Sequence, residues 1–267
     1  MSNGDALVVE SGLGDAFAAE HVVPGAEVHL DPDLTWVSHP GDFWRNAGVM
    51  ARFTSSAVEP RLDRIIRRYR ANGRGMGMWL FPAATPVNLP AVLRARRFRC
   101  RKYYPAMLRR LAKGRRSSQP AGITIEPLSD VTEFRKQAYP SIGPITTPLR
   151  AIALNRLAAL LGDPAQRTVV LVASHRGETV GAAELFVGPS SATLNGLHVV
   201  ASLRGRGFGT ALLERACREA ATRGASTIGL IATNEGERLY SRRGFAEVAR
   251  VGWWYRSFQR KPGVSRG

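Results

Sequence analysis

The stretch LRGRGFGTALLERACREAATRG, residues 203–224, places glycines at every second position between arginines and then continues with helical periodicity. Gly205, Gly207 and Gly209 allow a tight turn and a close approach of the backbone to a ligand. Apolar residues then recur at helical spacing up to Gly224, a residue typical of the end of a helix. Because a helix N-terminus carries unpaired amide donors and a partial positive charge, the stretch predicts a phosphate-binding site.

The spacing of the glycines shows which known type of phosphate-binding loop the sequence matches. The dinucleotide pattern GxGxxG fails, because the position that needs its last glycine is Thr210. The sequence contains no GxxxxGK[ST] pattern, which excludes the ATP-type P-loop. The residues instead spell Arg204-x-x-Gly207-x-Gly209, and they follow a strand-like apolar segment.

This loop resembles the acetyl-CoA loop of the GNAT superfamily of N-acetyltransferases. Residues 197–209, LHVVASLRGRGFG, match the family's strand and loop, and residues 232–245, ATNEGERLYSRRGF, are similar to its later strand-helix motif. The two motifs have the family's order and spacing, and together they cover most of residues 123–258. The resemblance implies an α/β protein with a mixed sheet and the GNAT-like acyl-CoA N-acyltransferase fold.

Apolar periodicity and turn residues predict further elements on both sides of a polar linker at residues 112–122. Residues 1–30 have little periodicity, and we expect them to be loosely structured. SHRGE, residues 174–178, predicts a hairpin turn. The predicted helices are 60–73, 86–98, 129–140, 149–162, the segment from the glycine loop to Gly224, and 234–244. The predicted strands are 76–81, 123–128, 168–174, 178–187, 192–200, 226–233 and 245–258. This order predicts a mixed sheet covered by helices on both faces.

The first half of the chain repeats the second in a degenerate form. In the first half, a helix is followed by NGRG, MGMWLF and VLRARRF. In the second half, a helix is followed in the same order by TRG, STIGLIAT and LYSRRGF. Aligning the two series pairs Leu93 with Tyr240. FTSSAVEP, residues 53–60, has no glycine where the loop should be. Residues 70–75, RANGRG, share the loop's spelling but follow a helix and precede a strand, so they cannot place glycines at a helix N-terminus.

We therefore expect two domains, residues 1–116 and residues 117–267. The first resembles the degenerate N-terminal lobe of tandem GNAT proteins, and we expect it to shape the acceptor pocket without binding coenzyme. The second is the predicted catalytic domain that binds acetyl-CoA or another acyl-CoA.

The resemblance assigns the coenzyme to the second domain. Backbone amides from Gly205 to Thr210 would hold the diphosphate, with Arg204 and Arg206 adding charge at its rim. The backbone of the preceding strand would bind the pantetheine arm, and one of its amides would face the thioester oxygen. Asn234 matches an asparagine that touches the coenzyme, although it could instead cap a helix. The predicted coenzyme-binding residues are Leu197, His198, Val199, Arg204, Gly205, Arg206, Gly207, Phe208, Gly209, Thr210 and Asn234.

Three residues are candidates for proton transfer. Tyr240 matches the family's tyrosine that donates a proton to the departing CoA thiolate, and its alternative role is a core aromatic residue. Glu184 or His198 could remove the proton of an amine, but Glu184 could equally face solvent, and His198 could contribute only its backbone. Five aromatic residues could line an acceptor pocket or pack between the lobes: Trp36, Trp44, Trp253, Trp254 and Tyr255.

Charge is distributed unevenly along the chain, whose net charge is +17. Residues 61–116 hold 17 Arg or Lys against Asp63 alone. Residues 92–116 could bind nucleic acid, but no nucleic-acid motif accompanies the charge. We therefore favour solvated helix and strand faces with a charged connector, and expect no nucleic-acid partner. Cys100 and Cys217 are the only cysteines, and we expect neither a disulfide nor a metal site. With no apolar run of 18 residues, the sequence predicts a cytoplasmic protein without a membrane partner.

These observations predict an acyl-CoA-dependent N-acyltransferase, with acetyl as the expected acyl group. We expect the enzyme to transfer that group directly to an amine of a small-molecule acceptor, and the sequence leaves a homodimer open. The alternatives are acetylation of a protein N-terminus or lysine, and an acyl-CoA-binding module without turnover.

Overall fold

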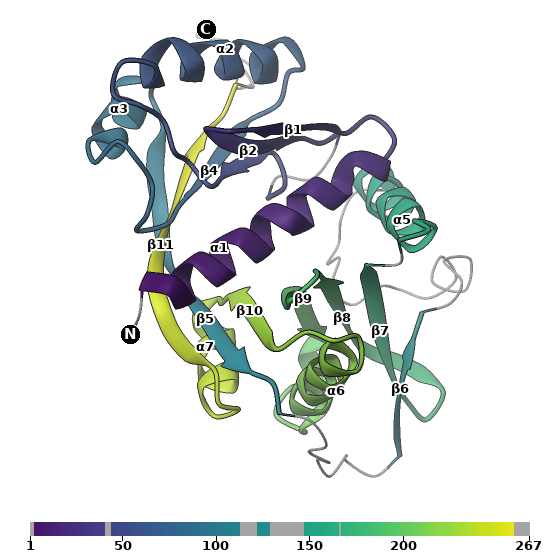
Figure 1. Cartoon of the computed structure of the whole chain (residues 1–267). Coiled ribbons are helices and arrows are strands. Elements are labelled where there is room, and N and C mark those ends of the chain that lie inside the picture. The colour runs from purple at the N-terminus through teal and green to yellow at the C-terminus, as the bar shows by residue number, and fades with distance from the viewer. Residues whose placement is uncertain (1–2, 41–43, 113–121, 129–146, 166, 259–267) are drawn as a thin grey trace, which may run out of the picture.

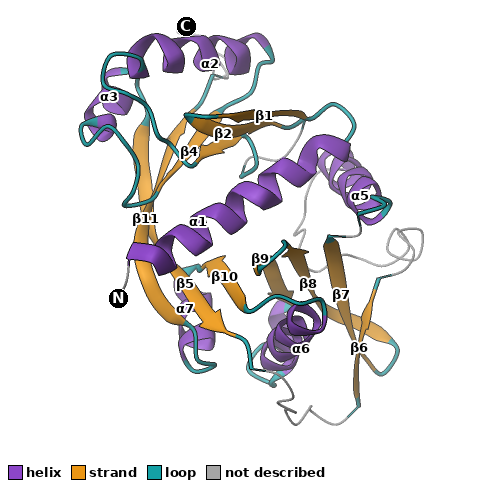
Figure 2. Cartoon of the chain, in the orientation of Figure 1, coloured by secondary structure: helices purple, strands orange, loops and turns teal. Residues whose placement is uncertain are grey.

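The computed structural model describes residues 3–40, 44–112, 122–128, 147–165 and 167–258 (Figures 1 and 2). Its strands form one sheet in the order β1-β2-β3-β4-β11-β5-β10-β9-β8-β7-β6. The helices are α1 (Asn3–Ala18), α2 (Val58–Ala71), α3 (Leu89–Ala95), α5 (Thr147–Leu161), α6 (Phe208–Thr222) and α7 (Asn234–Ser241), with short 3-10 helices η1 (Ala19–Val22) and η2 (Ala201–Leu203). The strands are β1 (Glu27–Asp31), β2 (Leu34–Ser38), β3 (Ala47–Val49), β4 (Met76–Leu80), β5 (Arg99–Arg110), β6 (Ile123–Pro127), β7 (Thr168–His175), β8 (Glu178–Val187), β9 (Ser191–Val199), β10 (Thr227–Ile231) and β11 (Ala246–Arg256).

Several elements end where the local sequence predicts. Helix α2 has Asn72 as its C-cap, followed by Gly73 at φ 65°. Strands β7 and β8 are joined through Arg176 at φ 53° and Gly177 at φ 82°. Two successive positive φ values match the twist of a tight hairpin, so the predicted turn is confirmed.

Helices cover both faces of the sheet, as predicted. In β4, Met76 and Met78 pack in a cluster with residues of α2 and α3, whereas the alternate residue Trp79 packs in the cluster that includes α1. In β10, Leu230 packs with α6, and a Cβ added at the alternate residue Gly229 would lie 3.1 Å from Val9 of α1. Because successive strand residues point to opposite faces, α1 lies on the face opposite α2, α3 and α6.

The internal repeat is visible as an exchange of strands. Helix α2, β4, α3 and β5 correspond in order to α6, β10, α7 and β11, yet the sheet order is β4-β11-β5-β10. Each half therefore places its last strand beside the preceding strand of the other half, and β5 pairs with both β10 and β11. Arg97 has a φ of 63° at the position of Gly244, which has a φ of 80°, as the repeat alignment requires.

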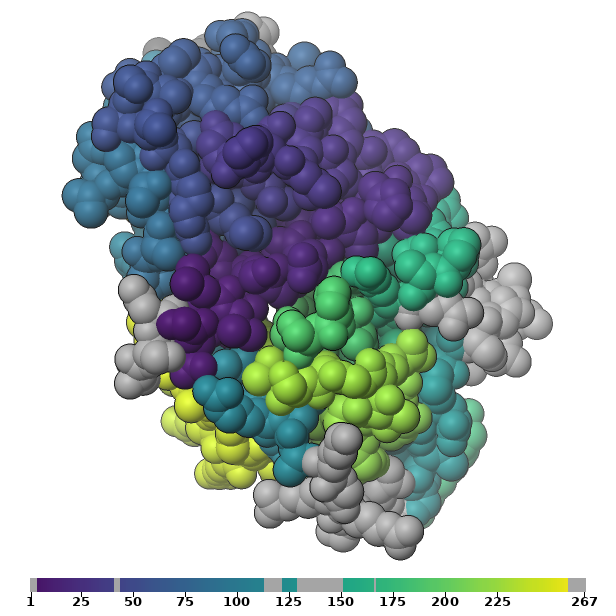
Figure 3. All heavy atoms as spheres, viewed as in Figure 1, coloured from purple at the N-terminus to yellow at the C-terminus, as the bar shows by residue number. Residues whose placement is uncertain are grey.

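The expectation that residues 1–30 are loosely structured is wrong. Helix α1 crosses the middle of the molecule, and Figure 3 shows the N-terminal segment at the surface between the blue residues of the first half and the green residues of the second. Two glycines allow this close packing: a Cβ added at Gly12 would lie 2.6 Å from Thr193 Oγ1, and one at Gly14 would lie 2.5 Å from Met50 Sδ. The segment has little amphipathic periodicity because it is packed between two halves rather than on one surface.

Two further expectations differ from the structure or lie beyond it. Residues 99–110 were expected to belong to solvated helix and strand faces with a charged connector; they form the long central strand β5, which is largely exposed in its first half and buried from Pro105 to Leu108. Most of the predicted linker at 112–122, and the predicted helix at 129–140, lie outside the described residues. The predicted domain boundary near residue 116 follows β5, although β5 itself pairs with β10 of the second half.

The aromatic residues pack mainly inside the protein. Trp36, Trp253 and Trp254 are buried, which favours packing over a pocket. Trp44 is 46% exposed, and its ring stacks on Trp79 with a centroid distance of 5.8 Å. The described helices include none that is long and apolar enough to span a membrane.

Candidate functional site

An opening in the sheet separates β9 from β10. The two strands pair in parallel at only three positions, ending at Thr193 opposite Gly229. From Leu194 to Val199, the edge of β9 that faces β10 has no strand partner among the described residues. An extended ligand could therefore add to this edge as a further strand.

The glycine loop lies between the end of β9 and the start of α6. Gly205 has a φ of 77°, and Gly207, the N-cap of α6, has a φ of 87°, so both require the left-handed conformation that glycine adopts readily. Phe208 is buried in the core and anchors the first turn of the helix. In the part of the chain that the structure describes, the amides from Gly205 to Thr210 have no backbone acceptor. The loop thus presents free N–H donors at a helix N-terminus, which suits an anion.

The side chain of Arg204 connects the end of β9 to the first turn of α7. Its Nε donates to the carbonyl of Val199 at 3.3 Å, and its Nη1 lies 3.5 Å from Glu235 Oε2 in the first turn of α7. Arg204 and Arg206 are both exposed. Their positive charges lie beside the free amides of the loop and would attract a diphosphate.

Tyr240 lies on α7 with its ring in the core. The ring centroid is 5.6 Å from that of Phe245, and a Cβ added at Gly236 would lie 2.7 Å from Tyr240 Cε2. Burial raises the pKa of Tyr240 to about 12, so its hydroxyl stays protonated at neutral pH. No hydrogen bond of that hydroxyl is recorded among the described residues, which leaves its proton available for a ligand.

Asn234 is the first residue of α7 and not its cap. Thr233 is the N-cap, since its Oγ1 accepts a hydrogen bond from the amide of Gly236 at 3.2 Å. The alternative interpretation of Asn234 as a capping residue is therefore wrong. Asn234 instead lines a surface cavity of about 470 Å³ on α7, together with Glu237, Arg238, Ser241 and Arg242.

The equivalent opening in the first lobe is closed by main-chain hydrogen bonds. Beyond the paired part of β3, the amide of Thr85 donates to Ala51 at 3.0 Å, and the amide of Phe53 donates to Thr85 at 3.2 Å. At the start of α2, the carbonyl of Thr54 accepts the amides of Ala57 and Val58. Within the described residues, only the second lobe combines an open strand edge with free loop amides.

Comparisons with known proteins agree with this geometry. The acetyltransferase (GNAT) family model matches residues 128–245. The chain carries a GNAT acetyltransferase domain. No curated protein matches the sequence.

Solved structures show that the GNAT domain is part of a larger shared fold. A GCN5-related N-acetyltransferase from Kribbella flavida has a TM-score of 0.68 at 17% identity, and the match covers 97% of this chain and 96% of that one. A tandem GNAT protein from the clavulanic acid biosynthesis pathway has a TM-score of 0.59 at 14% identity, with 97% of each chain covered. A GCN5-related N-acetyltransferase from Sphaerobacter thermophilus has a TM-score of 0.59 at 17% identity, covering 90% of this chain and 77% of that one. At these identities, the likeness establishes the fold with two lobes.

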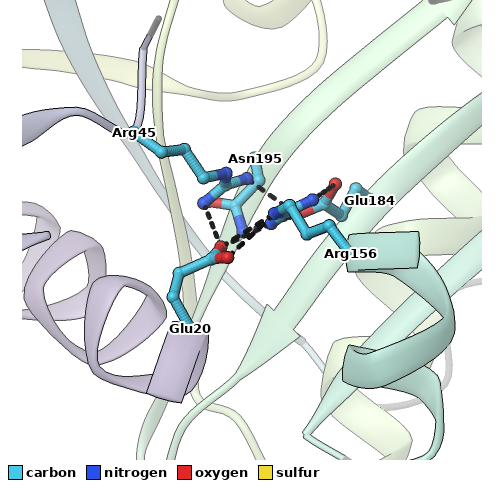
Figure 4. Close-up of polar contacts among 5 residues, drawn as sticks. All are labelled: Glu20, Arg45, Arg156, Glu184 and Asn195. Carbon is cyan, nitrogen blue, oxygen red and sulfur yellow. Dashed lines mark hydrogen bonds and ion pairs between the residues drawn. The ribbon is translucent and has the colours of Figure 1, made fainter. Parts of the chain in front are cut away.

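Glu184, a candidate base of the GNAT domain, lies in a network of buried charges (Figure 4). Arg156 donates to Glu184 at 2.8 and 3.0 Å and to Glu20 at 2.6, 2.9 and 3.0 Å. Arg45 bridges the same two carboxylates at 3.0 and 2.9 Å, and Asn195 Nδ2 donates to Glu184 at 3.3 Å. Burial alone would raise the pKa of Glu184, but the charges of Arg156 and Arg45 outweigh it and lower the pKa to about 2. A carboxylate held in this way is a poor proton acceptor, which argues against its expected role as a base.

His198 lies on the same face of the sheet as Glu184. It pairs with Ala182 of β8, two residues from Glu184, and its Nε2 would lie 3.4 Å from a Cβ added at Gly196. Burial and the nearby charge of Arg204 lower the pKa of His198. The imidazole is therefore neutral at neutral pH and able to accept a proton.

Three members of the buried network were not identified from the sequence. Glu20 lies within residues 1–30, which were expected to be loosely structured, Arg45 lies between strands, and Arg156 lies within a helix whose sequence gives no sign of a partner. Among the described residues, no group of three or more His, Cys, Asp or Glu side chains is placed to hold a metal ion.

Proposed function

We propose that the chain transfers an acyl group, expected to be acetyl, from CoA directly to an amine of a small-molecule acceptor. The observation that carries the proposal is the open edge of β9 next to the free amides of the loop before α6. The closed opening of the first lobe supports a single coenzyme site in the second.

In the proposed complex, the diphosphate of acetyl-CoA binds the amides from Gly205 to Thr210, and Arg204 and Arg206 neutralise its charge. The pantetheine arm lies along β9 from Leu197 to Val199, as a strand would. Both contacts use the backbone, so they depend on the left-handed glycines and on the missing strand partner rather than on particular side chains.

The reaction forms one C–N bond and breaks one C–S bond. The nitrogen lone pair of the amine attacks the thioester carbonyl carbon, and an amide of β9 stabilises the negative oxygen of the tetrahedral intermediate. The C–S bond then breaks, and the sulfur leaves with the bonding electrons. Tyr240 donates its proton to this thiolate, which gives free CoA, and is reprotonated from solvent.

The proton lost by the amine must go to a base or to water. We propose His198 for this role, directly or through a water molecule, because it lies on the same face of the sheet as Glu184 and its lowered pKa keeps it neutral. Glu184 is not proposed as the base, since two guanidinium groups already occupy its oxygens.

A small acceptor is favoured by the way the face of β8 and β9 is covered. Glu20 after α1, Arg45 before β3 and Arg156 of α5 all converge on Glu184, so three segments surround this face. Such an enclosed position suits a small molecule better than a folded protein substrate. We place the activity in the cytoplasm because acyl-CoA is supplied there.

The test is release of free thiol from acetyl-CoA in the presence of amino acids, aromatic amines, polyamines and a peptide with a free N-terminus. Faster turnover with a small amine than with the peptide supports the proposal, and the reverse order favours protein acetylation. Binding of CoA by calorimetry without thiol release from any amine would contradict catalysis and favour a binding module.

A further inference from the structure

We propose that the buried network of Glu20, Arg45, Arg156 and Glu184 positions the backbone of β9 for acyl transfer by holding Asn195 in a β-bulge. This inference rests on the proposed function and adds to it a set of positioning residues, two of which come from the first 45 residues of the chain.

The first observation is the bulge itself. Glu184 pairs with Gly196, but the next residue, Leu185, pairs with Leu194, so Asn195 is an extra residue in β9. A bulge changes the direction of neighbouring peptide groups and side chains. It lies where pairing between β9 and β10 has just ended, at the start of the edge that would bind the thioester arm. The orientation of the peptide groups at this point therefore decides where their N–H donors aim.

The second observation is that a side-chain hydrogen bond ties the bulge to the network. Asn195 Nδ2 donates to Glu184 Oε1 at 3.3 Å, across the β8–β9 pair. The position of Asn195 thus follows the position of the Glu184 carboxylate.

The third observation is that two guanidinium groups fix that carboxylate from different directions. Arg156 spans Glu184 and Glu20 with its planar donors, and Arg45 spans the same two carboxylates. The two positive and two negative charges balance, and Glu20 and Arg156 are 0% and 6% exposed. Removing one member would leave a buried charge without its partner, which the remaining side chains could relieve only by moving.

Two residues of the buried network lie far in the sequence from β9, so their effect on acyl transfer would be long-range. Glu20 follows α1, and Arg45 precedes β3, so both belong to the N-terminal half (Figure 4). Neither lies in the glycine loop or on the open edge of β9. They would act on transfer only through Glu184 and Asn195.

A matched control exists in α1, the helix that precedes Glu20. Glu10 of α1 is 1% exposed, and it pairs with Arg52, whose Nη1 donates to Glu10 Oε1 at 3.1 Å. This pair also joins α1 to the N-terminal lobe, but its recorded partners include no residue of β8 or β9. Glu10→Gln therefore removes a comparable buried ion pair without touching the bulge.

The experiment compares Glu20→Gln, Asn195→Ala and Glu10→Gln with the wild-type protein. Kinetics use acetyl-CoA and the amine that gives the fastest wild-type thiol release, and CoA affinity is measured by calorimetry. We expect Glu20→Gln and Asn195→Ala each to lower kcat about tenfold or more, with the Kd for CoA within twofold of wild type. Glu10→Gln should lower the unfolding temperature but leave kcat within twofold. The double variant Glu20→Gln/Asn195→Ala should lose no more activity than either single variant, because both changes act on the same bulge.

A second readout does not depend on turnover. In 1H–15N NMR spectra, Glu20→Gln should shift the backbone amide of Gly196, and Glu10→Gln should leave it in place. An unshifted Gly196 signal in folded Glu20→Gln would overturn the inference, as would equal kcat losses in Glu20→Gln and Glu10→Gln, or additive losses in the double variant. A wild-type protein that binds CoA but releases no thiol contradicts the proposed function instead, and the NMR comparison still decides whether the network positions the bulge.

Discussion

The conformation of Gly205 provides a direct test of the diphosphate site. Its φ is 77°, and a Cβ added there would meet no atom within 4 Å. Gly224 at the other end of α6 has a φ of 93° and equally open space. Changing either glycine to alanine therefore adds the same methyl group and the same kind of backbone strain, but only Gly205 lies in the loop whose amides are free.

The expected loss of stability is similar for the two variants. An L-residue in the left-handed region costs about 1–2 kcal/mol, and for a chain of this size each kcal/mol lowers Tm by roughly 2–4 °C. Both Gly205→Ala and Gly224→Ala should therefore melt a few degrees below wild type.

The expected loss of CoA affinity differs between them. If the loop relieves the strain at Gly205 by rotating, at least one N–H no longer points at the diphosphate. A hydrogen bond to a charged group contributes about 1.5–3 kcal/mol, which corresponds to a Kd for CoA raised roughly 10- to 100-fold. Gly224→Ala should leave that Kd within twofold.

Calorimetric titration with CoA measures the effect, and pantetheine, which lacks the diphosphate, serves as the ligand control. The loss in Gly205→Ala should appear with CoA and not with pantetheine. The reasoning is refuted if folded Gly205→Ala binds CoA like wild type, or if Gly224→Ala loses as much affinity.

Three further changes test separate parts of the structure. Tyr240→Phe should lower kcat by about 10²- to 10⁴-fold. The Kd for CoA and Tm should stay close to wild type, because the hydroxyl has no protein hydrogen-bond partner among the described residues. An unchanged kcat in a thiol-release assay would contradict the role of Tyr240 as the acid. Folding lowers the pKa of Glu184 from 4.5 to about 2. The ionised carboxylate therefore stabilises the folded protein fully above pH 4.5, and this contribution to the free energy of unfolding is lost as the pH falls towards 2. Urea unfolding at pH 6 and pH 3 should show about 2 kcal/mol more acid destabilisation in wild type than in Glu184→Gln, and equal pH dependence would contradict the shift. Arg97→Gly should raise the free energy of unfolding by about 1 kcal/mol, since Arg97 has a φ of 63°, and a lower Tm in thermal denaturation would count against relieved strain.

Local patterns predicted several features of both lobes. The glycine loop with the helix after it, the hairpin through Arg176 and Gly177, and the end of α2 at Asn72 all follow rules that act over a few residues. The repeat alignment that pairs Leu93 with Tyr240 also holds in the structure. Such features depend on neighbouring residues, so the sequence carries them without reference to distant segments.

Helix α1 shows the limit of this approach. Its apolar residues do not form one stripe, and its glycines weaken the helix when considered alone. The helix is stable because it packs between two lobes, where Gly12 lies against Thr193 and Gly14 against Met50. A local pattern cannot indicate surfaces that the rest of the chain supplies.

The candidate site likewise has some features that the local sequence determines and others that depend on tertiary contacts. The sequence alone determined which lobe has the glycine loop, that its helix N-terminus suits an anion, and that Tyr240 lies on the following helix, because each depends on residue type and short spacing. Only the tertiary structure decided that β5 and β11 change places, that β9 separates from β10, and that Glu20 and Arg45 reach Glu184. The physical reason is that strand pairing and buried ion pairs gain their free energy from contacts between residues far apart in the chain, and these contacts exist only after folding has brought the partners together.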